Sequence, residues 1–249
     1  MKRLINIWIL LIFVSCDSDS AFDCIQAAGS TVQVEIEVSN FERIIVNKDV
    51  ELLITEGLEY EVTIESGENL INDIEVNVVN GQLEITDNNN CNFVREYGIT
   101  KVYVSAPNIT EIRNSSQYEV SSVGILNYLD LTLISEDFNT YQDFTVGDFR
   151  LQVNSTSIQI VSNNISTYYI SGQTENLNIG FFAGAGRFEG ANLIAQNIDV
   201  FHRGSNDMIV NPQQSLTGEL KGTGDLISLN QPSIVDVIQF YIGQLIFSD

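Results

Sequence analysis

The stretch FRLQVNSTSIQIV, residues 149–161, alternates apolar and polar side chains in two short runs separated by Asn, Ser and Thr. Such alternation is typical of β-strands that bury one face. Similar runs occur before and after it as LDLTL, LNI and IDV, and apolar positions repeat about every 20 residues, as in the pairs Leu131 and Leu151, Leu177 and Ile198, and Val200 and Leu220. This ragged repeat predicts a β-solenoid, in which each coil is buried by stacking on the next. An irregular β-sandwich gives similar spacing and is the alternative.

The chain before residue 107 has the pattern of strands and hairpins. Val32, Val34 and Ile36 alternate with polar residues, and Asn80-Gly81 separates two further alternating runs. This dipeptide predicts a hairpin with a type I′ turn, because both positions tolerate positive φ. No sustained 3.6-residue apolar period follows the first 15 residues, so we expect almost no helix. The predicted fold class is all-β and β-solenoid or β-helix-like, with N-terminal strands and hairpins that continue into ragged coils.

The start of the chain has the composition of a bacterial lipoprotein signal. Lys2 and Arg3 precede an apolar run that ends at Val14 and is too short to span a bilayer as a stable helix. The run closes with FVSC, which resembles the lipobox, so we expect Cys16 to be lipidated and to become the new N-terminus. The alternative is an ordinary signal peptide. Lipidation predicts attachment to the cell envelope, and we expect the outer membrane with exposure at the cell surface; the sequence does not decide the leaflet.

These features predict three segments. A signal peptide covers residues 1–15, a lipidated tether covers 16–30, and an all-β domain covers 31–249. The change of pattern near residue 107 divides that domain into two packed halves, 31–106 and 107–249.

Charge and cysteine content narrow the function classes further. The chain has 33 acidic and 11 basic residues, a net charge of -22 that argues against nucleic acid as a partner. With Cys16 assigned to lipid, Cys24 and Cys91 remain in an oxidising compartment, which predicts a disulfide worth about 4 kcal/mol. Two free thiols are the alternative, and metal ligation is disfavoured because His202 is the only histidine.

Motifs for catalysis are sparse. His202 follows a predicted strand beside Arg203 and Gly204, and we interpret it as a surface turn residue. Gly184-Ala185-Gly186 lacks the third glycine of a dinucleotide fingerprint, and no helix follows it. We therefore expect no catalytic residues, no cofactor and no bound metal.

A carbohydrate-active enzyme, either a polysaccharide lyase or a hydrolase on a β-helix, is the alternative function. Such an enzyme needs clustered carboxylates and, for elimination, a basic residue beside them. The candidates are Arg150 and the acidic residues Glu136, Asp137, Asp143 and Asp148. Solvated loop charges are the simpler interpretation of this group.

Aromatic residues favour a binding role instead. Several crowd into the C-terminal half: Phe138, Tyr141, Phe144, Tyr168, Tyr169, Phe181, Phe182 and Phe201. An exposed row of aromatic rings can stack on sugars or dock a protein. We select Tyr141, Tyr168 and Tyr169 as candidate binding aromatics and expect a glycan or a surface protein as the ligand.

Four longer stretches resemble a known family. They are VELLITEGLEYEVTIESGENLINDIEVNVVNGQLEI (residues 50–85), CNFVREYGITKVYVSAPNITEIRNSS (91–116), FHRGSNDMIV (201–210) and LKGTGDLISLNQPSIV (220–235). They are similar to the auto-transporter adhesin, head GIN domain family of bacterial secreted lipoproteins, over about Phe41 to Leu245. The resemblance implies an all-β, solenoid-like fold and a role at the cell surface. Together with the sparse catalytic motifs, it leads us to expect a non-catalytic, adhesin-like binding or structural protein. The family's closing glycine-rich turn is reduced here to Ile242-Gly243-Gln244.

Overall fold

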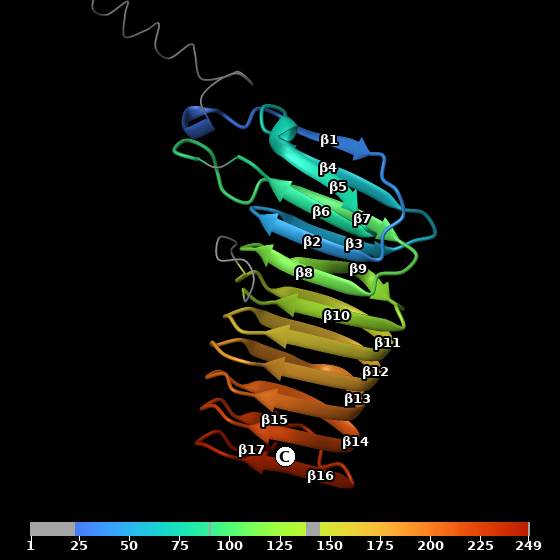
Figure 1. The fold of residues 1–249 in the computed structure, drawn as a ribbon, viewed down its shortest axis with the longest axis vertical. Helices are drawn as coiled ribbons and strands as arrows, with labels where there is room; N and C mark the ends of the chain where they lie inside the picture. The colour runs from blue at the N-terminus through green and yellow to red at the C-terminus, as the bar shows by residue number, and fades with distance from the viewer. Residues whose placement is uncertain (1–22, 90, 138–144, 249) are drawn as a thin grey trace, which may run out of the picture.

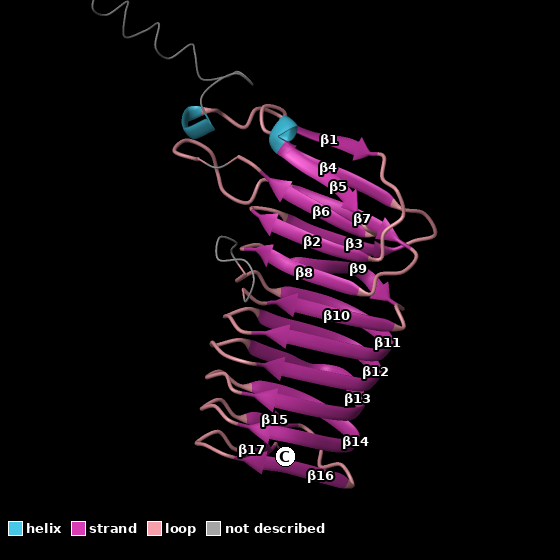
Figure 2. Ribbon diagram, in the orientation of Figure 1, coloured by secondary structure: helices cyan, strands magenta, loops and turns pink. Residues whose placement is uncertain are grey.

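The computed structural model describes residues 23–89, 91–137 and 145–248, so the predicted lipid site Cys16, the predicted binding residue Tyr141 and the acidic candidate Asp143 lie outside the described residues. The described chain forms one 17-stranded sheet and two short 3-10 turns, η1 (Asp23–Ile25) and η2 (Ile71–Asp73) (Figure 2). The prediction of an all-β fold with almost no helix is confirmed. No helix in these described ranges is long and apolar enough to cross a membrane.

The strands, in chain order, are β1 (Thr31–Ile36), β2 (Arg43–Lys48), β3 (Glu51–Glu56), β4 (Glu61–Gly67), β5 (Ile74–Val79), β6 (Gln82–Asp87), β7 (Lys101–Ala106), β8 (Glu111–Ser116), β9 (Val120–Leu126), β10 (Asp130–Ser135), β11 (Phe149–Ser162), β12 (Thr167–Phe181), β13 (Arg187–His202), β14 (Met208–Leu220), β15 (Leu226–Ser228), β16 (Ile234–Gln239) and β17 (Leu245–Phe247).

Strands that follow one another in the C-terminal part pair in parallel, so each turn of the chain adds a layer to a stack (Figure 1). Leu177 on β12 lies opposite Ile198 on β13, as the sequence spacing predicts, and Ile198 lies opposite Leu216 on β14. The other two pairs with this spacing are not register partners. Opposite Leu131 lies Ile158, and opposite Val200 lies Gly218. Because the connection between β10 and β11 is long, register partners on these two strands lie more than 20 positions apart in the sequence.

Each layer has two faces because the chain bends within the long strands. In β11 the buried side chains are Phe149, Leu151 and Val153, but after Ser157 the alternation changes phase and buries Ile158 and Ile160. The first halves of β11–β14 form one ladder with β9, β15 and β17, and the second halves form another with β8, β10 and β16. The buried apolar side chains of both ladders make one core between them.

Antiparallel strands cover the N-terminal end of the stack. The β2–β3 layer lies between β6–β7 and β8–β9 and pairs in parallel with both. Beyond it, β4 pairs antiparallel with β7, β1 with β4, and β5 with β6. Asn80 (φ 51°) and Gly81 (φ 73°) form the turn between β5 and β6, which confirms the predicted hairpin.

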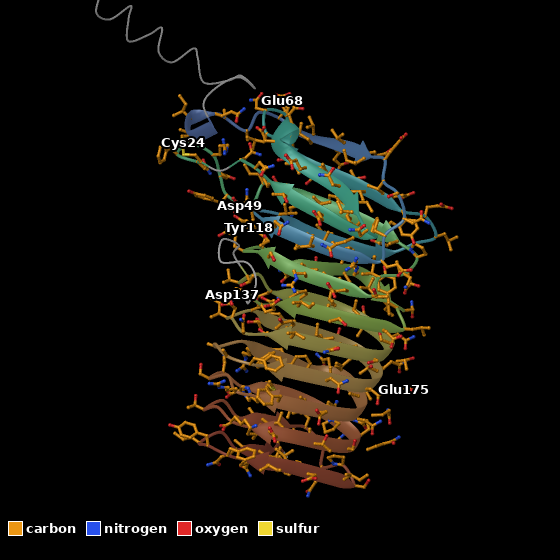
Figure 3. The ribbon with its side chains drawn as sticks, in the orientation of Figure 1. Cys24, Asp49, Glu68, Tyr118, Asp137 and Glu175 are labelled. Carbon is orange, nitrogen blue, oxygen red and sulfur yellow. A yellow bond between two sulfur atoms is a disulfide. The ribbon has the colours of Figure 1, made fainter. Side chains whose placement is uncertain are left out.

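The predicted disulfide is confirmed. Cys24 and Cys91 are bonded at an S–S distance of 2.06 Å, and Figure 3 places Cys24 at the N-terminal end of the stack. The Phe93 N–H donates to the Cys24 carbonyl at 2.9 Å, and the Arg95 guanidinium donates to the carbonyls of Cys91 at 2.8 Å and Gln26 at 3.4 Å. The bridge thus ties η1 to the connection between β6 and β7.

Candidate binding surface

The two neighbouring tyrosines of β12, Tyr168 and Tyr169, face opposite sides of the sheet. Tyr168 is fully buried, stacks on Phe149 with ring centroids 5.0 Å apart, and lies 5.7 Å from the ring of Phe181. Burial raises the pKa of its phenol. The prediction of Tyr168 as a binding residue is therefore wrong, because side chains alternate along a strand and its position faces the core.

Tyr169 faces outward and lies in a row of charged side chains that crosses four layers. The Arg150 guanidinium lies 4.1 Å from the Tyr169 ring centroid, within cation–π range, and Arg150 Nε lies 3.0 Å from Glu119 Oε2. On the other side of Tyr169, its register partner Glu189 pairs with Arg187 at 2.5 Å. We call Glu119, Arg150, Tyr169, Glu189 and Arg187 the Tyr169 row.

The Tyr169 row borders a shallow hollow of about 370 Å³. Its lining also includes the polar residues Ser122, Gln152, Ser171 and Asn192 and the apolar residues Leu151, Ile170 and Ala191. A flat aromatic ring beside hydroxyl and amide groups can stack on the apolar face of a ligand while hydrogen bonds fix its orientation. The arrangement suits a polar ligand with a flat apolar side.

A second aromatic cluster lies on the outer face of the other ladder. Phe182 and Phe201 stack with ring centroids 5.2 Å apart, and the Lys221 ammonium lies 5.0 Å from the Phe201 ring and 4.9 Å from the Phe240 ring. Lys221 also pairs with Glu219 at 2.5 Å. We call Phe182, Phe201, Lys221 and Phe240 the phenylalanine cluster.

Only part of the phenylalanine cluster could be recognised in the sequence. Phe182 and Phe201 belong to the crowded aromatic residues of the C-terminal half but were not predicted to bind a ligand, and Lys221 and Phe240 were not predicted at all. The signal lies in the layer repeat: Lys221 and Phe240 are the first residues after β14 and β16, so their amides donate to the carbonyls of His202 and Leu220. An alignment of strand ends, rather than of apolar positions, places these residues above one another.

The described acidic candidates for catalysis, Glu136, Asp137 and Asp148, each have a different partner. Glu136 is buried and pairs with Arg113 at 2.7 Å. Asp137, which lies at the loop edge of the stack (Figure 3), accepts from the Asn163 amide at 2.7 Å, and Asp148 accepts from the Thr167 N–H at 2.7 Å. Each described carboxylate therefore stabilises a different loop or strand end, and Arg150 belongs to the Tyr169 row.

His202 is a core residue, so its interpretation as a surface turn residue is wrong. It is fully buried at the end of β13, 5.9 Å from the Phe181 ring, and its Nδ1 accepts from the Gly204 N–H at 3.3 Å. Among the described residues, none forms a hydrogen bond of normal geometry with its Nε2. Burial lowers the pKa of the imidazole, although the Asn206 backbone and the carboxylates of Asp207 and Asp225 oppose this shift.

The described residues contain no group of three or more His, Cys, Asp or Glu side chains that could hold a metal ion.

Comparison with known proteins gives a family and a fold. The family model described as "Putative auto-transporter adhesin, head GIN domain" matches residues 40–232. No curated protein matches the chain.

Solved structures share the fold at low sequence identity. A crystal structure titled "putative adhesin" from Bacteroides fragilis has a TM-score of 0.79 at 16% identity and covers 89% of this chain and 99% of its own. One titled "Putative lipid binding protein" from Parabacteroides distasonis has a TM-score of 0.59 at 13% identity, covering 89% and 98%. One titled "putative adhesin" from Parabacteroides merdae has a TM-score of 0.57 at 12% identity, covering 89% and 97%. At these identities the likeness concerns the fold alone.

Proposed function

The chain belongs to the auto-transporter adhesin, head GIN domain family, and from this premise we propose that it is a lipid-anchored, adhesin-like binding protein of the bacterial cell envelope and not an enzyme. The observation that carries the binding role is the Tyr169 row, which presents an aromatic ring, paired charges and a polar hollow on an outward sheet face. The proposed ligand is a glycan or a surface protein. The proposed location is the outer membrane, with the domain exposed at the cell surface.

We also infer that the stack of two-faced layers is a β-solenoid. Parallel pairing of successive turns and a core between the two ladders support this description. In a solenoid, equivalent side chains of successive layers form rows, and neighbouring side chains within a row are about 4.8 Å apart. Rows of this kind provide a rigid, extended surface without the tuned pKa values that catalysis requires.

The anchor is tested by changing Cys16 to Ala. We expect the variant to lose acylation and leave the membrane fraction, because two or more acyl chains account for lasting attachment of such proteins. Mass spectrometry of the mature N-terminus and fractionation after a salt wash measure the two effects. A variant that stays with the membrane would contradict the proposal for the anchor but not that for binding.

Binding is tested on an array of glycans and matrix proteins with residues 23–249, which contain every described strand and the disulfide. Tyr169→Ala should weaken binding to any ligand found by roughly tenfold, as expected when an aromatic stacking partner worth about 1.5 kcal/mol is removed. Tyr97→Ala is the control, because Tyr97 is another surface tyrosine, more exposed than the half-buried Tyr169, and lies in the connection between β6 and β7. An equal loss of affinity in both variants, or no loss of affinity in either, would refute the Tyr169 row as the binding site.

The enzyme alternative has its own decisive result. Turnover of a polysaccharide that disappears in a variant carrying Glu136→Gln, Asp137→Asn and Asp148→Asn, while the fold is retained, would replace the binding proposal by catalysis.

The variant Phe201→Ala removes the centre of the phenylalanine cluster. Its binding on the array of glycans and matrix proteins shows whether this second surface contributes to binding.

A further inference from the structure

The last described layer of the stack leaves part of the core exposed. Leu216 on β14 and Leu226 on β15 are fully buried because β16 and β17 lie over them. Their register partners one layer further on, Val235 and Leu245, have no described layer beyond them, and Val235 is 38% exposed. Side chains at core positions are thus presented at the surface. We call residues 234–247 the open end, and Figure 1 shows it at the opposite end of the stack from β1.

The open end also carries a free strand edge. Among the described residues, β16 pairs only with β14 and β17 only with β15. The Phe240 N–H donates to the Leu220 carbonyl at 2.8 Å, toward β14. Because successive amides of a strand point to opposite edges, those of Val235, Val237 and Gln239 point away from β14. A free edge with unpaired N–H and C=O groups is a template for another strand.

The surroundings of the edge are apolar and nearly uncharged. Exposed apolar side chains cover it: Ile234, Ile238, Phe240, Tyr241, Ile242 and Ile246. Asp236 is the single charged residue between positions 229 and 248, although the chain as a whole carries a net charge of -22. A partner with the same acidic composition would be repelled over most of the molecule but not here.

The opposite end has different chemistry. The edge strand β1 and its neighbour β4 carry Glu35, Glu61 and Glu65 and no basic residue. Two copies meeting by their β1 ends would place these carboxylates together. A β1 end stacked on the open end would bring them onto an apolar surface without a counter-charge, which is costly. Open end against open end is the one end-to-end arrangement that avoids both costs.

We propose that the open end binds the open end of a second copy of this chain. A two-fold axis makes the two β16 strands antiparallel, so the free N–H and C=O groups of each can bond to the other. It also places Val235, Val237, Leu245 and their copies in one shared core. The open end thereby serves as an interface in place of a capping layer.

The test is sedimentation velocity of residues 23–249 over a range of concentrations. We expect a reversible monomer–dimer equilibrium, and Val235→Glu should weaken self-association about tenfold or more because it would bury two unpaired carboxylates in the shared core. Val34→Glu is the matched control: Val34 is also a valine in an edge strand, also 38% exposed, and lies in β1. It should leave the equilibrium unchanged. Circular dichroism confirms that each variant is folded.

A second measurement needs no variant. Hydrogen exchange of the unaltered protein at low and high concentration should show slower exchange in β16 at high concentration, with β1 unchanged. A monomer at every concentration, loss of the dimer in Val34→Glu alone or in both variants, or a dimer that Val235→Glu leaves intact would overturn the proposal. So would concentration-dependent protection confined to β1.

Discussion

At the scale of single residues, one position along a strand decides between core and surface. Tyr168 packs between Phe149 and Phe181, while Tyr169 lies under Arg150. The sequence held the signal for this difference, since Ile170 is two residues from Tyr168 and therefore on the same face. Aromatic crowding alone could not separate the two tyrosines, because it ignores the phase of the alternation.

The buried imidazole of His202 should make the free energy of unfolding depend on pH. Its unfolded-state pKa is about 6.5, and burial lowers the native value below this. The unfolded chain therefore binds a proton before the native protein does. The free energy of unfolding should fall as pH drops through about 6.5 toward the lower native pKa, by at most about 1.4 kcal/mol per pH unit.

The variant His202→Asn tests this pH dependence. Its amide oxygen can accept from the Gly204 N–H, as Nδ1 does, but it cannot titrate. We expect a lower baseline stability and a flatter dependence between pH 7.5 and pH 5.5 in urea titrations. Parallel curves for the variant and the unaltered protein would show that the imidazole does not cause the pH dependence.

At the scale of elements, close contact between layers depends on glycine. Gly172 on β12 has φ 110°, and a Cβ there would lie 2.0 Å from the Val153 carbonyl oxygen of β11. Gly124 on β9 also has positive φ, 85°, but a Cβ there meets nothing within 4 Å. The two positions separate the cost of backbone strain from the cost of collision between layers.

We expect Gly124→Ala to lower the free energy of unfolding by about 1 kcal/mol, through the left-handed backbone alone. Gly172→Ala should cost about 1–3 kcal/mol more, because the added methyl group also forces β11 and β12 apart. Urea unfolding of both variants measures the difference. Equal destabilisation would mean that the layers can separate at Gly172 without cost.

The register of the layers could be predicted only in part. The alternation identified the strands, and one spacing, from Leu177 to Ile198, gave a true layer pair. Leu131 and Leu151 are not partners, because each long strand buries two runs with opposite phase and Leu131 stacks on the second run, at Ile158. Apolar spacing cannot distinguish the two runs, and loops of different length shift the repeat.

At the scale of the whole molecule, the two ends have different roles. The proposed tether, residues 16–30, includes η1 and leads into β1, whereas the open end is the far end of the stack from β1 (Figure 1). If both proposals hold, a dimer through the open ends joins two anchored molecules at their membrane-distal tips. The two ends also differ in charge, because β1 and β4 carry Glu35, Glu61 and Glu65, whereas residues 229–248 contain one acidic residue.

The disulfide protects the tether end. In a stacked fold, each layer depends mainly on its neighbours, so a local change should act locally. Replacing Cys24 and Cys91 by Ser removes a constraint of about 4 kcal/mol in the chain-entropy model. We expect faster hydrogen exchange in β1, β4 and the connection between β6 and β7, and little change in β12 and β13, which lie several layers away. Exchange that rises equally in β12 and β13 would show instead that the stack unfolds as one cooperative unit, and the bridge would then stabilise every layer rather than the N-terminal end.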